Sequence, residues 1–196
     1  MKAAIREILT TILLALLFFV AIRAVVCNFE VHGFSMEPNL HDGQFIIVSK
    51  AAYWFADPQR GDIVVFQTDR LNHGIIHRIV GLPNELIELR NGVLYVNGEK
   101  LKEPYVRGHS VSVSPRKVPN DSFFIVGDNR AATSWDIVPR RDIVGRAWLI
   151  YWPISEWGLV PNHQWESEAA GKEQLDAGAL GLPYSLRVDV SRTGAL

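Results

Sequence analysis

Two residues in this sequence carry side chains that together can hydrolyse an amide bond. Ser35 lies in a short loop, residues 33–40, and His77 lies in an apolar run farther along the chain. A serine hydroxyl is a poor nucleophile at neutral pH, so it needs a neighbouring base to take its proton and donors to stabilise the oxyanion. Histidine is neutral at pH 7 because its unperturbed pKa is about 6.5. The sequence therefore offers Ser35 as a nucleophile and His77 as its general base.

Each of these residues, taken alone, also has a simpler structural interpretation. A serine in a loop that contains Gly33 and Pro38 is usually a turn residue. Period-two alternation places His77 on the same strand face as Ile75 and Ile79. A histidine on such a face is more often a core residue than a base. The catalytic interpretation therefore depends on the motifs around both residues.

Four motifs, in this order and spacing, resemble those of the type I signal peptidases. They are Ser-Met-Glu-Pro at 35–38, Arg-Gly-Asp-Ile-Val-Val-Phe at 60–66, His-Arg-Ile-Val-Gly-Leu-Pro at 77–83 and Gly-Asp-Asn-Arg at 127–130. The resemblance spans residues 8 to 153. It implies a membrane-bound serine endopeptidase that removes signal peptides from secreted preproteins, with no cofactor and no metal.

The resemblance also assigns the nucleophile and the oxyanion donors. In the family, the serine before Met-x-Pro is the nucleophile, and its own amide helps to form the oxyanion hole. Some members place a second serine two residues earlier, where this chain has Gly33. We therefore expect the backbone amides of Gly33 and Ser35 to bind the oxyanion. Asn39 replaces the threonine that is common after Met-x-Pro, and this leaves the assignment of Ser35 unchanged.

The base is where the sequence departs from the usual bacterial pattern. Most bacterial members use a lysine, which burial must make neutral, whereas a histidine is neutral with an unperturbed pKa. His77 resembles the base of the endoplasmic-reticulum signal peptidases and of a minority of bacterial ones. None of the six lysines aligns with this position. Lys50 is the nearest alternative after Ser35, but it follows a predicted strand at a turn, so we rank it below His77.

The resemblance implies several residues that support the base. They are Arg78, Asp128, Ser134 and Asp136. Arg78 is expected to pair with Asp128, and either acid could hold the second nitrogen of His77, which fixes the tautomer. Segment 131–136 departs from the family pattern by one residue. Either Thr133 is the supporting hydroxyl, or Ser134 and Asp136 form the family's Ser-x-Asp, and we expect the second. The 128–130 motif could equally be a surface turn.

The N-terminal segment must hold this site at a membrane. Residues 8–27 are apolar except for Thr10, Thr11 and the charged Arg23, and about 20 helical residues cross the ~30 Å hydrocarbon core. Lys2 and Arg6 precede them, which favours a cytoplasmic N-terminus. A cleaved signal or a lipoprotein would need small residues at its cleavage site, before Cys27 in the second case, and they are absent. We therefore expect an uncleaved, single-pass plasma-membrane anchor with the catalytic domain on the extracytoplasmic side.

The rest of the chain predicts a mostly β fold. Seven runs are rich in Val, Ile and Phe: 44–49, 62–67, 75–81, 85–89, 93–96, 122–126 and 144–151. Asn-Gly pairs flank the 93–96 run and favour tight hairpins. We expect a signal-peptidase-like antiparallel β-sheet catalytic domain after one transmembrane helix. The predicted divisions are 1–28 for the stub and anchor, 29–154 for the peptidase domain and 155–196 for a weakly ordered tail.

Composition and one aromatic cluster complete the predictions. The formal net charge of −1, without a basic patch, argues against nucleic acid as a partner, and the single cysteine, Cys27, excludes an intramolecular disulfide. The expected partners are the signal peptides of secretory preproteins and the lipid bilayer. The consecutive aromatic residues Tyr53, Trp54 and Phe55 either plug the core under a loop or form a lip that enters the headgroup region.

Two other classes of protein remain open at the level of sequence. The self-cleaving repressors and translesion-polymerase subunits resemble this family in fold, but they use a lysine base and lack an anchor. A catalytically inactive, membrane-anchored binding module of the same fold is the other alternative, in which His77 marks the loss of the base. The presence of Ser35, Arg78 and Asp128 argues against that loss.

Overall fold

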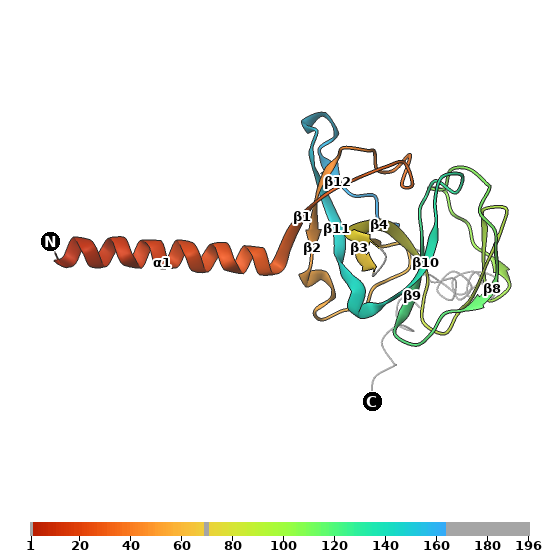
Figure 1. Ribbon diagram of the computed structural model, residues 1–196, viewed down its shortest axis with the longest axis horizontal. Helices are drawn as coiled ribbons and strands as arrows, with labels where there is room; N and C mark the ends of the chain where they lie inside the picture. The colour runs from red at the N-terminus through yellow and green to blue at the C-terminus, as the bar shows by residue number, and fades with distance from the viewer. Residues whose placement is uncertain (1, 69–70, 164–196) are drawn as a thin grey trace, which may run out of the picture. The chain divides into compact units, whose positions relative to one another are not determined.

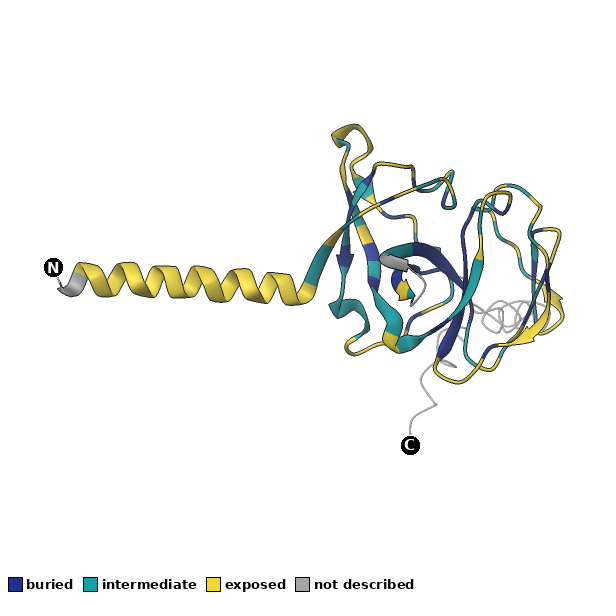
Figure 2. Cartoon of the chain, in the orientation of Figure 1, coloured by how far each residue is buried: buried dark blue, intermediate teal, exposed yellow. Residues whose placement is uncertain are grey.

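A computed structural model describes residues 2–68 and 71–163 of the chain (Figure 1). Its first element is α1 (Lys2–Val25), which contains a 22-residue candidate membrane span, Ala4–Val25, of mean hydropathy 2.6. The protein itself buries none of this span's apolar window, so α1 is exposed along its length (Figure 2). A helix that is apolar and unburied in this way has the length and composition to cross a bilayer.

The rest of the described chain is antiparallel β-sheet, which confirms the predicted fold class. A larger sheet has the order β1-β2-β11-β3-β4-β9-β10, and β12 pairs with β11. Its strands are β1 (Val26–Glu30), β2 (Phe45–Ser49), β3 (Ile63–Thr68), β4 (Leu71–Gly81), β9 (Ser122–Val126), β10 (Trp135–Pro139), β11 (Ile143–Trp152) and β12 (Gly158–Leu159).

A smaller sheet has the order β7-β6-β5-β8. Its strands are β5 (Leu86–Arg90), β6 (Val93–Val96), β7 (Glu99–Lys100) and β8 (Val113–Lys117). The turns around β6 have the backbone that Asn-Gly pairs predict, with φ of 48° and 77° at Asn91 and Gly92 and 52° and 88° at Asn97 and Gly98. Three short 3-10 helices, η1 (Ala51–Tyr53), η2 (Arg140–Asp142) and η3 (Ile154–Glu156), complete the elements.

All seven predicted strands are present, and five further strands were not predicted from the sequence. β1 continues directly from the apolar helix, so composition does not separate the two. β8 contains a proline and two basic residues, a composition tolerated at a sheet edge. β7 and β12 have only two residues each, too few for a periodic pattern. β10 carries Asp and Pro between its apolar residues.

The observed boundaries differ from the predicted ones at both ends of the β domain. The helix ends at Val25, and β1 begins at Val26, so the anchor is shorter than residues 1–28. The β domain continues past residue 154, because β12 pairs with β11 and Val160 is buried in the core. The side-chain oxygen of Asn162 accepts a 2.7 Å hydrogen bond from the Ile63 amide, which fixes this last segment. The remainder of the predicted tail, 164–196, lies outside the described residues.

The aromatic cluster at 53–55 divides between the two interpretations. The Tyr53 hydroxyl donates to Asp62 Oδ2 at 2.8 Å, and its ring packs against a buried apolar cluster. Trp54 and Phe55 are 54% and 97% exposed. Tyr53 therefore acts as a core plug, and the lipid-facing lip stays a prediction for Trp54 and Phe55.

Candidate active site

The structure brings Ser35 and His77 into hydrogen-bonding contact. Ser35 lies in the turn between β1 and β2, and His77 lies in β4, opposite Val64 of β3. The distance between Ser35 Oγ and His77 Nε2 is 3.1 Å. Ser35 is only half-buried, whereas His77 is 4% exposed. The hydroxyl can therefore reach a substrate while the imidazole lies behind it, shielded from water.

The environment of His77 keeps its ring neutral. Burial lowers the pKa of His77 from 6.5 to about 4. Its inner nitrogen, Nδ1, has no hydrogen-bond partner among the described residues, and the ring of Phe66 lies 6.1 Å away between centroids. The expected carboxylate on this nitrogen is therefore not found. His77 sits in a strand whose neighbours on that face are apolar, and neither candidate acid reaches Nδ1.

The hydroxyl beside the base belongs to Thr133 and not to Ser134. Thr133 Oγ1 lies 3.5 Å from His77 Nε2, accepts a hydrogen bond from Gly127 N–H at 3.0 Å and donates to Ser134 O at 2.8 Å. Ser134 takes part through its carbonyl, and its side chain is exposed. The amide of Gly127 holds Thr133, the residue before the expected Ser134, against the imidazole.

Asp128 is occupied by another partner, Arg78. Both side chains are fully buried, and Arg78 Nε and Nη2 donate to the two carboxylate oxygens at 2.8 and 2.7 Å. Arg78 Nη1 donates to Gly61 O and Pro161 O, and the guanidinium lies 4.0 Å from the ring centroid of Tyr105. The ion pair expected from the resemblance is therefore present. It is fully buried and links β4, next to His77, to the 127–130 motif.

Asp136 lies apart from the base. It is half-buried on β10, opposite Ile125 of β9. Within residues 2–68 and 71–163 it makes no hydrogen bond or ion pair with His77. Lys50, the alternative base, directs its ammonium to Arg23 O at the end of α1, at 3.3 Å, and away from Ser35.

The loop that carries Ser35 is held by two asparagines. The Asn129 amide donates to Ser35 O at 2.9 Å, and its side chain donates to Phe34 O at 3.0 Å. Asn39 Nδ2 donates to Asp128 Oδ2 at 2.8 Å and to Tyr105 O at 2.9 Å. Neither asparagine has a role that was predicted from the sequence. Two features of the sequence could have indicated these roles. Asn129 lies in the 127–130 motif, and Asn39 stands where the family commonly has a threonine.

Gly127 allows the loop and the base to approach each other. A Cβ atom at this position would overlap Ser35 O and Thr133 Oγ1. The backbone of the Gly-Asp-Asn-Arg motif therefore lies directly between the nucleophile and the hydroxyl that contacts the base. Glycine is required here for close packing.

One of the two expected oxyanion donors is engaged elsewhere. The Gly33 amide donates to Asp42 Oδ1 at 2.7 Å, and Gly33 has a φ of +84°. The Ser35 amide donates to no acceptor in the part of the chain that the structure describes. It is therefore the backbone donor that remains available next to the nucleophile. In the same part of the chain, no group of three or more His, Cys, Asp or Glu could hold a metal ion.

Comparisons with known proteins show the family to which the chain is similar. Residues 5–152 match the family described as signal peptidase, peptidase S26. The chain is 36% identical over 166 residues to a signal peptidase I of Leptolyngbya laminosa, covering 78% of this chain and 82% of that protein. It is 36% identical over 168 residues to the probable signal peptidase I-2 of Synechocystis sp., covering 80% and 77%. A signal peptidase I of Bacillus licheniformis is 30% identical over 172 residues, covering 79% and 92%.

Proposed function

The chain belongs to the signal peptidase family, peptidase S26, and we propose that it cleaves signal peptides with Ser35 as nucleophile and His77 as general base. It is a serine endopeptidase of the signal peptidase I type. The observation that carries the proposed chemistry is the 3.1 Å separation of Ser35 Oγ and His77 Nε2 in a site that keeps the imidazole neutral.

The first step is transfer of the Ser35 proton to His77. Nε2 must accept this proton, so the neutral ring carries its own hydrogen on Nδ1. As the proton moves to Nε2, Ser35 Oγ attacks the scissile carbonyl and a tetrahedral intermediate forms. The Ser35 amide, which has no acceptor among the described residues, donates to the oxyanion. Breakdown of the intermediate returns the proton from Nε2 to the leaving amine, and water then hydrolyses the acyl-enzyme through the same base.

Thr133 stabilises the protonated form of the base. Its hydroxyl hydrogen is directed to Ser134 O, and one lone pair accepts the Gly127 amide. The remaining lone pair lies 3.5 Å from His77 Nε2 and can accept the new N–H when the imidazolium forms. Since Nδ1 has no partner among the described residues, Thr133 and the oxyanion are the groups there that offset the cost of a buried positive charge. Thr133 is thus a positioning residue for the base.

The substrates that fit this family are the signal peptides of secretory preproteins. The resemblance implies small side chains one and three positions before the cleaved bond, and an extended segment that pairs with strand edges near Ser35. We assign the N-terminus to the cytoplasm and the β domain to the extracytoplasmic side of the plasma membrane, since the basic residues Lys2 and Arg6 lie at the N-terminal end of α1. Confinement to one bilayer raises the effective concentration of a membrane-inserted substrate.

Cleavage of a purified preprotein by the full-length protein in detergent or lipid tests this proposal. Ser35→Ala removes the nucleophile and is expected to abolish cleavage. His77→Ala removes the base, and a loss of roughly 10²- to 10⁴-fold is expected. His77→Lys should retain part of the activity with an alkaline-shifted pH profile, because the unperturbed pKa of lysine is about 10.4.

The outcomes of this experiment separate the proposal from its alternative. Wild-type rates in His77→Ala would remove that residue from the mechanism. Cleavage that persists in Ser35→Ala would identify a different nucleophile. If the wild-type protein cleaves no preprotein in any lipid while still binding signal peptides, the inactive binding module becomes the better description. Accessibility of the β domain to an added protease in intact cells and spheroplasts tests the assigned orientation.

A further inference from the structure

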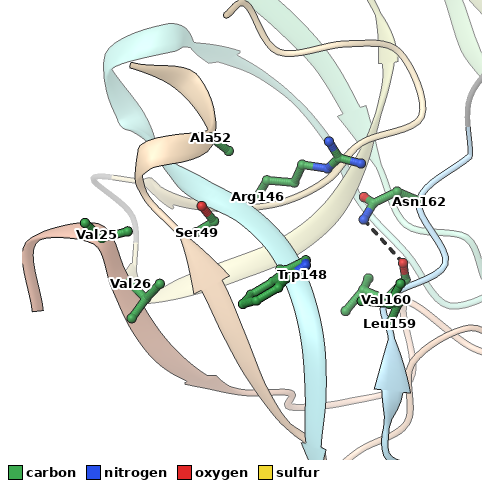
Figure 3. A pocket seen from close by; sticks show the side chains of 9 residues that line it. All are labelled: Val25, Val26, Ser49, Ala52, Arg146, Trp148, Leu159, Val160 and Asn162. Atoms are coloured by element: carbon green, nitrogen blue, oxygen red, sulfur yellow. Dashed lines mark hydrogen bonds between the residues drawn. The ribbon is translucent and has the colours of Figure 1, made fainter. Parts of the chain in front are cut away.

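A cavity of about 580 Å³ opens where the membrane helix passes into the β domain (Figure 3). Val25 and Val26 line it from the junction of α1 and β1, Arg146 and Trp148 from β11, and Leu159 from β12. None of the residues of the active site lines it. It is therefore a separate feature, and what it binds does not depend on the chemistry at Ser35.

The position of the cavity places it at the membrane surface. Val25 is the last residue of the 22-residue candidate span, and Val26 is the first residue of the β domain. A span of this length reaches from one side of the ~30 Å hydrocarbon core to the other. Side chains at its last residue lie at the depth of the lipid headgroups and the first acyl carbons. A lipid can enter the cavity from the leaflet without leaving the bilayer.

The lining combines apolar walls with a guanidinium. Trp148 and Leu159 are 52% and 70% exposed, and Figure 3 shows Trp148 between Val26 and the 159–160 segment. Arg146 Nε pairs with Asp62 Oδ1 at 3.1 Å. Its two terminal nitrogens have no acceptor among the described residues, so they remain available to an incoming oxyanion. Arginine binds phosphate well through these nitrogens.

Charge around the cavity favours an anionic ligand. Lys50 follows Ser49 of the lining, and its ammonium donates to Arg23 O at the end of α1 at 3.3 Å, so one further cation stands at the helix end next to the cavity. The carboxylate that faces Arg146 is Asp62, which is 5% exposed and also accepts from Tyr53 and Gln59. Among the described residues, the cations Arg146 and Lys50 therefore lie at or next to the cavity, against one buried carboxylate. A soluble anion would use the cations but not the exposed apolar walls.

We propose that this cavity binds one anionic phospholipid of the leaflet into which α1 emerges. Arg146, with Lys50 nearby, holds the phosphate, and the glycerol and first acyl carbons pack on Val25, Val26 and Trp148. The bound lipid fixes the height of the β domain above the bilayer. Basic residues at a membrane surface each strengthen binding to anionic lipid several-fold, so removal of Arg146 alone should be measurable.

Native mass spectrometry of the full-length protein in detergent, titrated with phosphatidylglycerol or with phosphatidylcholine of the same acyl chains, tests this proposal. The wild type should retain one phosphatidylglycerol in preference to phosphatidylcholine. Arg146→Gln is expected to weaken phosphatidylglycerol binding roughly fivefold or more. The matched control is Arg116→Gln, an exposed arginine of β8 outside the cavity, which should bind as the wild type does.

A second variant decides the matter if Arg146→Gln unfolds because Asp62 loses its partner. Leu159→Glu places a negative charge on the exposed wall without disturbing the core, and it should weaken phosphatidylglycerol binding by a similar factor. Unchanged phosphatidylglycerol retention in a folded Arg146→Gln or Leu159→Glu protein would overturn the proposal. It would also be overturned if inorganic phosphate at millimolar concentration displaced the lipid completely, since the site would then be one for soluble anions. Neither outcome bears on catalysis by Ser35.

Discussion

The two halves of the active site are held in place by different forces. His77 lies inside β4, where burial and apolar neighbours fix it and its inner nitrogen has no partner among the described residues. Ser35 lies on a loop that hydrogen bonds from Asn39 and Asn129 attach to the rest of the domain. The base is thus positioned by packing, whereas buried Met36 and Leu40 anchor the loop of the nucleophile in the core and polar contacts hold the backbone at Ser35 itself. Damage to the first should appear in stability, and damage to the second should appear mainly in activity.

Asp128 contacts both halves of the active site, so its removal should have the largest effect on stability. It binds Arg78, the neighbour of His77 in β4, and it accepts the side chain of Asn39 from the loop. Asp128→Ala leaves a fully buried guanidinium without its counter-ion, which costs about 3–5 kcal/mol in the free energy of unfolding. Urea unfolding in detergent, followed by tryptophan fluorescence, measures this loss.

The control for Asp128 is a pair that water screens. Arg141 and Asp142 lie 3.7 Å apart on the surface, with side chains 84% and 40% exposed. Asp142→Ala should unfold as the wild type does. If Asp128→Ala were as stable as Asp142→Ala, the buried Arg78–Asp128 pair would not be what holds the two halves of the site together.

The half of the active site that contains His77, here called the strand side, predicts a specific dependence of stability on pH. Burial lowers the pKa of His77 to about 4, whereas the unfolded chain has the ordinary value of 6.5. Between these values the unfolded state binds a proton that the folded state does not, so stability falls as the pH drops from about 6.5 to 4. This loss of stability approaches about 3 kcal/mol below pH 4, and it is absent above about pH 6.5, where the imidazole is neutral in both states.

The variant that isolates this effect is His77→Leu, which removes the titrating group from the same apolar site. Its urea midpoint should depend less on pH than that of the wild type between pH 4 and 6.5, and the two curves should run parallel at higher pH. Parallel curves over the whole range would show that the imidazole is solvated in solution. The claim that burial and packing hold His77 in place would then be wrong.

Thr133 tests where the two halves meet. Thr133→Val keeps the shape but removes the oxygen that lies 3.5 Å from His77 Nε2 and the acceptor of the Gly127 amide. A hydrogen bond to a charged group is worth about 1.5–3 kcal/mol, so kcat should fall roughly 10- to 100-fold. Thr133→Ser should restore most of it, and Ser134→Ala should have little effect. Equal losses in Thr133→Val and Ser134→Ala would indicate that the segment, and not the hydroxyl, is what matters.

Much of the strand side follows from local sequence, because its residues repeat with the period of a β-strand. The alternation around residue 77 predicts that His77 shares a strand face with Ile79, although both faces are buried there, and the partner of Arg78 is implied by the family resemblance. Asn-Gly pairs predict two turns with the correct sign of φ. For the strand and the two turns, the signal lies within a few residues of the feature that it predicts.

The half of the site that contains the Ser35 loop, here called the loop side, and the surroundings of His77 are determined by long-range contacts, which a local sequence pattern does not reveal. Gly33 gives its amide to Asp42, nine residues away, which removes it from the oxyanion hole. Thr133 replaces Ser134 beside the base because the backbone at Gly127 fixes the register of that segment. The missing partner of His77 Nδ1 is a property of packing in three dimensions, and β12 is too short to leave a pattern.

Asn129 gives the smallest expected effect and the clearest test of the loop side. Its side chain donates to Phe34 O and accepts from the Ala131 amide, while its own amide bonds to Ser35 O whatever the side chain. Asn129→Ala should cost only about 1–2 kcal/mol in stability, because it removes two exposed hydrogen bonds that are each worth about 0.5–1 kcal/mol. The loop that carries the nucleophile then loses one of its few attachments, so kcat should fall several-fold while KM changes less. A fall in stability with unchanged kcat would mean that Ser35, like His77, is positioned by packing.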